Sequence, residues 1–223
     1  MKFVLPERQS KILGSSRTDA MVSANQTAFE LFLYDEPLFD FPGFLSLFNK
    51  NLPQDIRANT IEEVDNLFNI IQNPKYKEYL YLFSFGEKNH PFCAPLMATI
   101  QDDLNINLMM VGAKLFEGSH NFKNYCVAPS ENTKFERTIM KSEIRINQVY
   151  TANFFPEMSY VFTIQGAGFL RSQIRLMMGT LIQLGKGELQ LTDIEESLQP
   201  ENTLVMSYIA PASGLILNRI EFD

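Results

Sequence analysis

One segment constrains the fold of this chain more than any other, the apolar stretch from residue 76 to residue 85. It reads Tyr-Lys-Glu-Tyr-Leu-Tyr-Leu-Phe-Ser-Phe, so aromatic side chains alternate with Leu80 and Leu82. Successive side chains of a β-strand point to opposite faces of its sheet. Because both sets are apolar, the pattern predicts a strand that is buried on both sides.

Further elements are predicted from the spacing of apolar residues. Helical spacing is found at 41–51, 98–116 and 169–184, and a capping pattern with Thr192 as N-cap predicts a short helix at 192–199. Strands are predicted at 11–13, 26–34, 136–147, 159–165 and 214–222, and 61–68 fits either a short helix or an extended segment. Because strands and helices do not alternate strictly, this order indicates an α+β fold with a mostly antiparallel sheet.

A polar turn at 87–91 predicts a boundary between two halves, residues 1–87 and 88–223. The composition, 45% hydrophobic and 20% charged over 223 residues, is typical of a soluble globular protein with a sizeable core. No run is long enough to span a membrane, and the chain start lacks the apolar core of a signal peptide. We therefore expect a cytoplasmic protein without a membrane partner.

Cysteine and charge content narrow the chemistry further. Cys93 and Cys126 lie far apart, and with only two histidines they do not suggest a zinc site, so we expect free thiols and no metal. The formal net charge of −7 argues against non-specific nucleic-acid binding, which depends on basic surface. A local basic patch at Arg171, Arg175 and Lys186 stays compatible with this charge.

The tripeptide Arg17-Thr18-Asp19 is the first candidate for chemistry. It lies in residues 14–24, a segment too rich in Gly and Ser for a helix interior, and it leads into a predicted strand. Loops on a rigid scaffold often carry functional groups. The structural alternative is that Asp19 caps a helix or closes an Asx-turn.

Arg171 and Arg175 are the second candidate, predicted one turn apart on the helix from Phe169 to Leu184. Because they border an apolar face, each either extends to water or pairs with a carboxylate. Gly166 and Gly168 do not form a dinucleotide-binding motif, since Arg171 stands where the third glycine would be. No Gly-x-Ser-x-Gly elbow or phosphate loop is present either.

Short stretches spread over the chain from residue 14 to its last strand carry a family resemblance. They are Arg17-Thr18-Asp19-Ala20, Leu52–Ile56, Lys77–Tyr81, Gly118–Phe122, Gly168–Leu181 with Ile174-Arg175 inside it, and Ala210–Leu215. In this order they resemble the signatures of the tRNA pseudouridine synthase A (TruA) family. Each stretch alone is a weak signal, and their collinear agreement is a strong one.

The resemblance implies a pseudouridine synthase fold, with two ferredoxin-like halves that share a mostly antiparallel sheet, helices on one face and a central cleft. It also implies a homodimer that isomerises uridine to pseudouridine in tRNA, in the anticodon stem-loop, without a cofactor. By the same resemblance Asp19 is the nucleophile, Tyr79 stacks on the target uracil and Arg175 pairs with Asp19. The expected substrate-binding residues are Arg17, Thr18, His120, Phe169, Leu170 and Arg171.

Several positions depart from the family pattern. Met21 and Ser23 replace a usual glycine and histidine, Asn121 replaces an aspartate, and Ile71 stands where a basic residue is usual. Few residues precede Asp19 and no Trp is present, so the segment that opens the family's chains is expected to be lacking. An alternative hypothesis follows: a catalytically impaired relative that acts as an RNA-binding or protein-interaction module.

Overall fold

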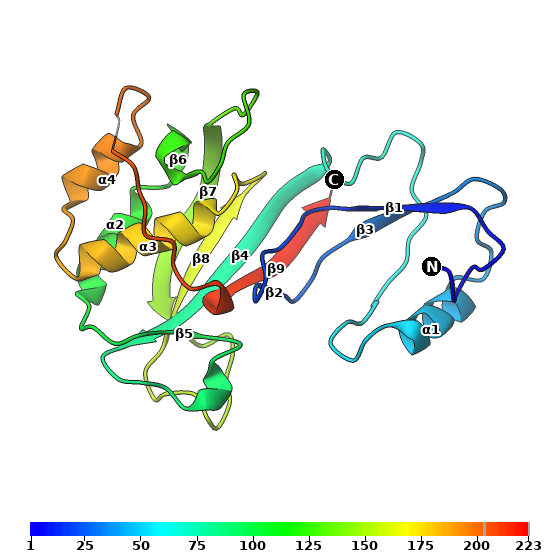
Figure 1. Cartoon of the computed structure of the whole chain (residues 1–223), viewed down its shortest axis with the longest axis horizontal. Helices are drawn as coiled ribbons and strands as arrows, with labels where there is room; N and C mark the ends of the chain where they lie inside the picture. Colours follow the sequence, from blue (N-terminus) through cyan, green and yellow to red (C-terminus); the bar gives the residue numbers. More distant parts are fainter. Residues whose placement is uncertain (203, 223) are drawn as a thin grey trace. The chain divides into compact units, whose positions relative to one another are not determined.

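The computed structural model describes residues 1–202 and 204–222, which adopt an α+β fold (Figure 1). The strands are β1 (Ser10–Gly14), β2 (Ser23–Ala24), β3 (Phe29–Leu33), β4 (Pro74–Phe85), β5 (Ala98–Ile100), β6 (Gly118–Asn121), β7 (Glu136–Ile146), β8 (Tyr160–Gly166) and β9 (Leu215–Phe222). The helices are α1 (Phe41–Asn51), α2 (Ile106–Lys114), α3 (Gln173–Gly185) and α4 (Leu191–Ser197). The chain divides into two compact units, residues 1–17 with 28–73 and residues 18–27 with 74–223.

The first unit contains an antiparallel pair, β1 with β3, and the helix α1. Helix α1 begins as predicted because the Asp40 carboxylate accepts a hydrogen bond from the Gly43 N–H at 2.8 Å and Pro42 fits the first turn. Phe44 and Phe48 stack on one face of α1, with ring centroids 5.6 Å apart.

The second unit is built on a seven-stranded mixed sheet. Its strand order is β2-β9-β4-β8-β7-β6, and β5 pairs with the end of β4. Pairing is antiparallel except for two parallel pairs, β2 with β9 and β4 with β5. The mostly antiparallel sheet predicted from the sequence is therefore confirmed, with β4 bonded to a neighbour on each side.

Helices α2, α3 and α4 cover one face of this sheet. Buried side chains of the strands, such as Tyr81, Phe83 and Phe162, share one core with Met109 of α2 and Met177 of α3. On the opposite face a smaller core encloses the other side of β4. It contains Leu80, Leu82, Cys93, Met97, Val161 and Ile216, with Tyr150, Phe154 and Phe155 packed against it. Strand β4 is buried on both sides, as its alternating sequence predicted.

Three predicted helices differ from the structure at their starts. The segment 98–116 was predicted as one helix, but Ala98–Ile100 form β5, and α2 starts only after Asn105, which caps it. Helix α3 begins at Gln173 and not at Phe169, because Ser172 adopts a left-handed backbone with φ of 59°. Helix α4 is capped by Gln190 with Asp193, two residues before the predicted pair.

The compact units do not coincide with the halves 1–87 and 88–223 predicted from the sequence. Strand β4 belongs with residues up to 223 because it pairs with β8 and β9, so the predicted boundary near residue 87 lies inside the second unit. Residues 18–27 also belong to this unit, since β2 pairs with β9. Asp19 and the C-terminal helices are thus part of one compact body.

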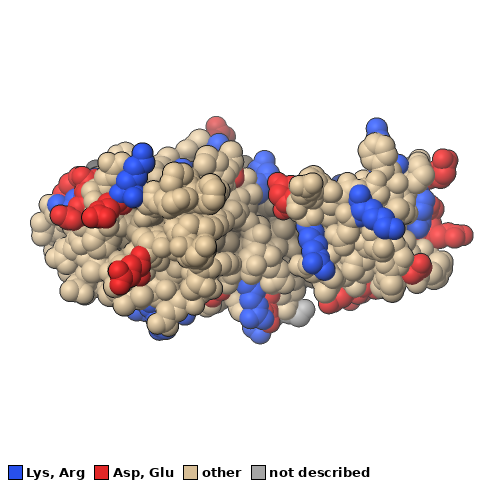
Figure 2. Space-filling model, turned by 90° about the horizontal axis from the view of Figure 1, so that it is seen from below, with Lys and Arg blue, Asp and Glu red and all other residues tan. Residues whose placement is uncertain are grey.

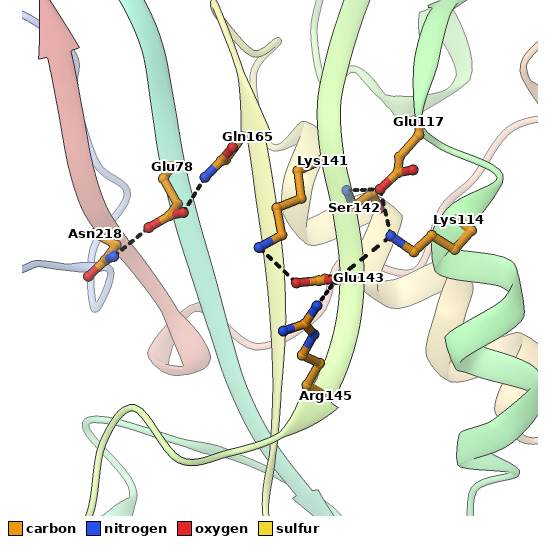
Figure 3. Close-up of polar contacts among 9 residues, drawn as sticks. All are labelled: Glu78, Lys114, Glu117, Lys141, Ser142, Glu143, Arg145, Gln165 and Asn218. Carbon is orange, nitrogen blue, oxygen red and sulfur yellow. Dashed lines mark hydrogen bonds and ion pairs between the residues drawn. The ribbon is translucent and has the colours of Figure 1, made fainter.

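A charged cluster lies on β7, around the nearly buried Glu143 (Figure 3). Lys141 and Arg145 contact its carboxylate at 2.8 and 2.9 Å, and Lys114 of α2 lies 3.8 Å away. Burial opposes ionisation of Glu143, but the Lys141 hydrogen bond and the three positive charges together lower its pKa below the usual value.

Candidate active site

The loop that carries Asp19 contains a tight turn. The Val22 N–H donates to the Asp19 carbonyl at 3.1 Å, and Met21, the third residue of the turn, has a φ of 67°. Ala20 does not have a positive φ, so the geometry is that of a type II turn, in which glycine is preferred at the third position. Met21 therefore adopts the left-handed backbone for which the family's glycine is suited, and its side chain is exposed.

The far end of this loop is tied to the sheet. Strand β2 pairs with Ile216 and Leu217 of β9, and the Asn25 N–H donates to the Leu217 carbonyl at 2.8 Å. The Asn25 side chain reaches Asn218, which donates to the Glu78 carboxylate at 2.6 Å. Figure 3 shows Glu78 between Asn218 of β9 and Gln165 of β8, both of which donate to it. Hydrogen bonds to β9 therefore fix the end of the loop that follows Asp19.

Asp19 forms an ion pair with Arg175. The Arg175 Nη1 lies 2.9 Å from Asp19 Oδ2, and their side chains are 18% and 47% exposed. Arg175 is the third residue of α3. The structure therefore brings together the two residues that the resemblance pairs, from segments 156 residues apart.

A second contact of Arg175 has no counterpart in the sequence analysis. Its Nε donates to the Ala210 carbonyl at 2.8 Å, and the Ala210 N–H donates back to the Arg175 carbonyl at 3.0 Å. Sequence reasoning missed this partner because it is a backbone group, which any residue type provides. The signal that marked the region was the Ala210–Leu215 stretch of the family resemblance.

Tyr79 lies on β4, on the face that the helices cover. The residue is 9% exposed, and its ring meets the Phe169 ring edge-on, with centroids 5.3 Å apart. Leu217 of β9 is paired with Tyr79 on one side and with Ala24 of β2 on the other. Neighbouring strands are about 4.8 Å apart, so Ala24, at the far end of the Asp19 loop, lies about two strand spacings from the Tyr79 backbone.

The other predicted substrate-binding residues are less closely grouped. Thr18 is exposed beside Asp19, and Leu170 is buried, with its N–H bonded to the Gln173 side chain at 2.7 Å. Arg17 is exposed and belongs to the first compact unit. His120 lies on the edge strand β6, and its Nε2 is 2.8 Å from the Glu117 carbonyl oxygen. Among the described residues, no contact joins His120 to Asp19 or Arg175.

Arg171 is placed differently from the prediction. It precedes α3 instead of lying on it, and its side chain is exposed. Its carbonyl accepts from the Val127 N–H at 3.1 Å, which brings it beside Cys126. Burial raises the pKa of the Cys126 thiol, against the attraction of the Arg171 and Arg137 charges. Within residues 1–202 and 204–222, neither arginine forms an ion pair with a carboxylate.

One face of the molecule carries side chains of both charges. On the face drawn in Figure 2, Lys and Arg side chains lie among Asp and Glu side chains, without one continuous basic field. In the described part of the chain, no group of His, Cys, Asp and Glu is arranged to hold a metal ion. None of the helices described above has both the length and the apolar character that crossing a membrane requires.

Comparison with known proteins gives a consistent result. The family model described as tRNA pseudouridine synthase matches residues 113–223. The chain is 34% identical over 217 residues to tRNA pseudouridine synthase A 2 of Bacillus thuringiensis subsp. konkukian, covering 96% of this chain and 83% of that protein. It is 32% identical over 218 residues to tRNA pseudouridine synthase A of Staphylococcus aureus strain MRSA252, covering 97% and 78%.

Proposed function

This chain belongs to the tRNA pseudouridine synthase A (TruA) family, and from that membership we propose that it isomerises uridine to pseudouridine in tRNA with Asp19 as the nucleophile. The observation that carries the proposal is the ion pair between Asp19 and Arg175. A carboxylate that attacks a nucleoside needs a fixed orientation and a partner for its charge. Arg175 provides both, because its fork-shaped guanidinium is held by the fold at 18% exposure.

The proposed reaction exchanges one bond of the nucleoside for another. The bond between N1 of uracil and C1′ of ribose breaks, the base turns, and a bond forms between C5 and C1′. The proton on C5 is released and N1 takes up a proton, so no external reactant is consumed. The Asp19 carboxylate supplies the nucleophile that allows the bond to N1 to break.

The target base has to leave the RNA stack before this chemistry can occur. Tyr79 is proposed to receive the uracil, because an aromatic face can stack on an extruded base. The contact with Phe169 supports this role, since an edge-on neighbour limits the orientations of the Tyr79 ring. Thr18, Leu170 and Arg171 are proposed to contact the nucleotides around it, and Arg17 and His120 to contact the RNA further away.

The finer features implied by the family are part of the same proposal. They are the anticodon stem-loop as target, a homodimer, a cytoplasmic location, and a cleft between two ferredoxin-like halves. Equilibrium sedimentation tests the homodimer, and mapping the modified positions of a tRNA transcript tests the target. The absence of pseudouridine from the anticodon arm of a modified transcript would contradict the proposed target.

The release of tritium from tRNA labelled at C5 of uracil tests the reaction itself. We expect release by the wild type and none by Asp19→Ala. Asp102→Asn is the matched control, because Asp102 also forms an exposed ion pair, with Lys186 at 2.6 Å. If the wild type binds tRNA without releasing tritium, the alternative of an impaired relative that acts as a binding module replaces this proposal.

A further inference from the structure

We propose that the extended segment 208–211 is a positioning element that aims Arg175 at Asp19, and that Tyr81 and Gly179 hold this segment in place. The inference rests on the proposed function, because it assigns roles to residues outside the reacting groups. This segment belongs to the connection that leads from α4 to β9, and in Figure 1 that connection crosses α3. Its backbone, more than its side chains, makes the contacts described below.

The first step concerns the orientation of the guanidinium. Arg175 Nε is bonded to the Ala210 carbonyl, and Nη1 of the same planar group is bonded to Asp19. A planar guanidinium with two of its nitrogens bonded has few orientations left. The position of the Ala210 carbonyl therefore determines where Nη1 points.

The second step explains how the segment lies so close to α3. A Cβ atom on Gly179 would be 1.8 Å from the Tyr208 carbonyl oxygen, far inside contact distance. Only glycine leaves room for this backbone approach, one turn of helix beyond Arg175. The closeness also allows the return bond from the Ala210 N–H to the Arg175 carbonyl.

The third step concerns the opposite side of the segment. The hydroxyl of Tyr81, whose ring is fully buried, donates to the Pro211 carbonyl at 2.8 Å. Further along, a Cβ on Gly214 would lie 2.8 Å from the Tyr81 ring, so the chain is packed tightly against that tyrosine. Tyr81 and Gly179 thus hold the segment from β4 and from α3.

The test removes one of these restraints with little change in side-chain volume. Tyr81→Phe deletes only the hydroxyl that holds Pro211. Tyr125→Phe is the matched control, because Tyr125 is also fully buried and its hydroxyl bonds the Ser197 hydroxyl at 2.7 Å, away from Arg175. We expect kcat to fall about tenfold or more in Tyr81→Phe, with KM for tRNA within about twofold, and little change in Tyr125→Phe.

Two further measurements separate positioning from general loss of stability. In an Arg175→Lys background, Tyr81→Phe should lower kcat by less than about twofold more, because the residue through which it acts has already lost its fork. In wild-type protein, the Arg175 Nε–H signal in nitrogen-15 NMR should exchange slowly with water. Tyr81→Phe should accelerate that exchange about tenfold, and Tyr125→Phe should not.

Unchanged exchange in Tyr81→Phe, or equal loss of kcat in both tyrosine variants, would overturn the inference. The exchange measurement does not depend on catalysis, so an inactive wild type would defeat the proposed function and leave this test intact. Gly179→Ala gives a second check from the other side of the segment. It should accelerate Arg175 Nε–H exchange as well, and unchanged exchange in the folded variant would contradict the role of Gly179.

Discussion

Asp19 and Arg175 lie 156 residues apart in the sequence and 2.9 Å apart in the fold. Arg175 occupies the first turn of α3, where the helix dipole disfavours a positive charge. Local helix stability therefore does not explain an arginine at this position. The contact with Asp19 does, since a carboxylate compensates the charge where the helix cannot.

We predict that Arg175→Lys loses most activity although the charge is kept. A lysine has one nitrogen, which cannot serve both Asp19 and the Ala210 carbonyl in the same geometry. We expect kcat for pseudouridine formation to fall about a hundredfold, with a much smaller effect on KM.

Arg145→Lys is the control for this exchange, because Arg145 is 71% exposed and contacts Glu143 away from Asp19. It should keep kcat within about twofold of the wild type. Equal rates for Arg175→Lys and the wild type would show that the simultaneous contacts of Arg175 with Asp19 and the Ala210 carbonyl are not required.

Met21→Gly is predicted to stabilise the protein. The left-handed backbone at Met21 costs about 1–2 kcal/mol for a residue with a Cβ. Glycine removes this cost and adds about 0.5–1 kcal/mol of chain entropy in the unfolded state. The net gain in the free energy of unfolding should be about 0.5–1 kcal/mol, measured by urea denaturation.

The neighbouring substitution Ala20→Gly has the opposite expected sign. Ala20 lacks a positive φ, so glycine brings only the entropic loss of about 0.4–1 kcal/mol. If Met21→Gly destabilises the protein as much as Ala20→Gly, the turn carries no strain at Met21.

Arg171→Ala is predicted to weaken tRNA binding and its dependence on salt. The Arg171 side chain is exposed two residues after Phe169, which packs on Tyr79, so it can meet a phosphate near the base that is proposed to stack on Tyr79. Loss of one phosphate contact should reduce the slope of log K against log salt by about 0.7–0.9. Lys88 is exposed and follows the C-terminal end of β4. Lys88→Ala should therefore leave the slope unchanged.

Glu143→Gln is predicted to make the free energy of unfolding fall less steeply as the pH is lowered. Since the folded pKa of Glu143 lies below its unfolded value, ionisation contributes stability above the unfolded pKa. That stability is lost as pH falls through the folded pKa. Urea denaturation should find wild type more stable by about 1–2 kcal/mol at pH 7, with the difference shrinking at pH 3.

Glu131→Gln removes an exposed carboxylate elsewhere and should leave the pH dependence of the free energy of unfolding unchanged. A constant difference between Glu143→Gln and wild type across this pH range would show that the three cations around Glu143 do not act through its ionisation.

Elements with strong periodicity could be predicted from the sequence. The alternation around Leu80 and Leu82 identified β4, and Phe44 with the proline after Leu52 bounded α1. The starts of α2 and α3 could not be predicted, because each depends on the backbone conformation of a single residue. Asn105 caps α2 and Ser172 adopts a left-handed backbone, and neither residue type requires that conformation.

For the proposed site, the sequence around Asp19 and Arg175 marked both residues as candidates, and the family resemblance added Tyr79 and the pairing of Asp19 with Arg175. The residues that hold them were not found, because the Ala210 carbonyl and the closeness of Tyr208 to Gly179 are backbone properties. Such contacts appear only when segments distant in the sequence are folded against each other.

The pairing of β2 with β9 has a consequence for protein synthesis. Asn25 is translated early, and its partner Asn218 follows 193 residues later. While the ribosome is still elongating, the nascent polypeptide has no β9 on which to place the loop of Asp19. Enzymatic competence should therefore arise late in synthesis, when β9 emerges and pairs with both β4 and β2.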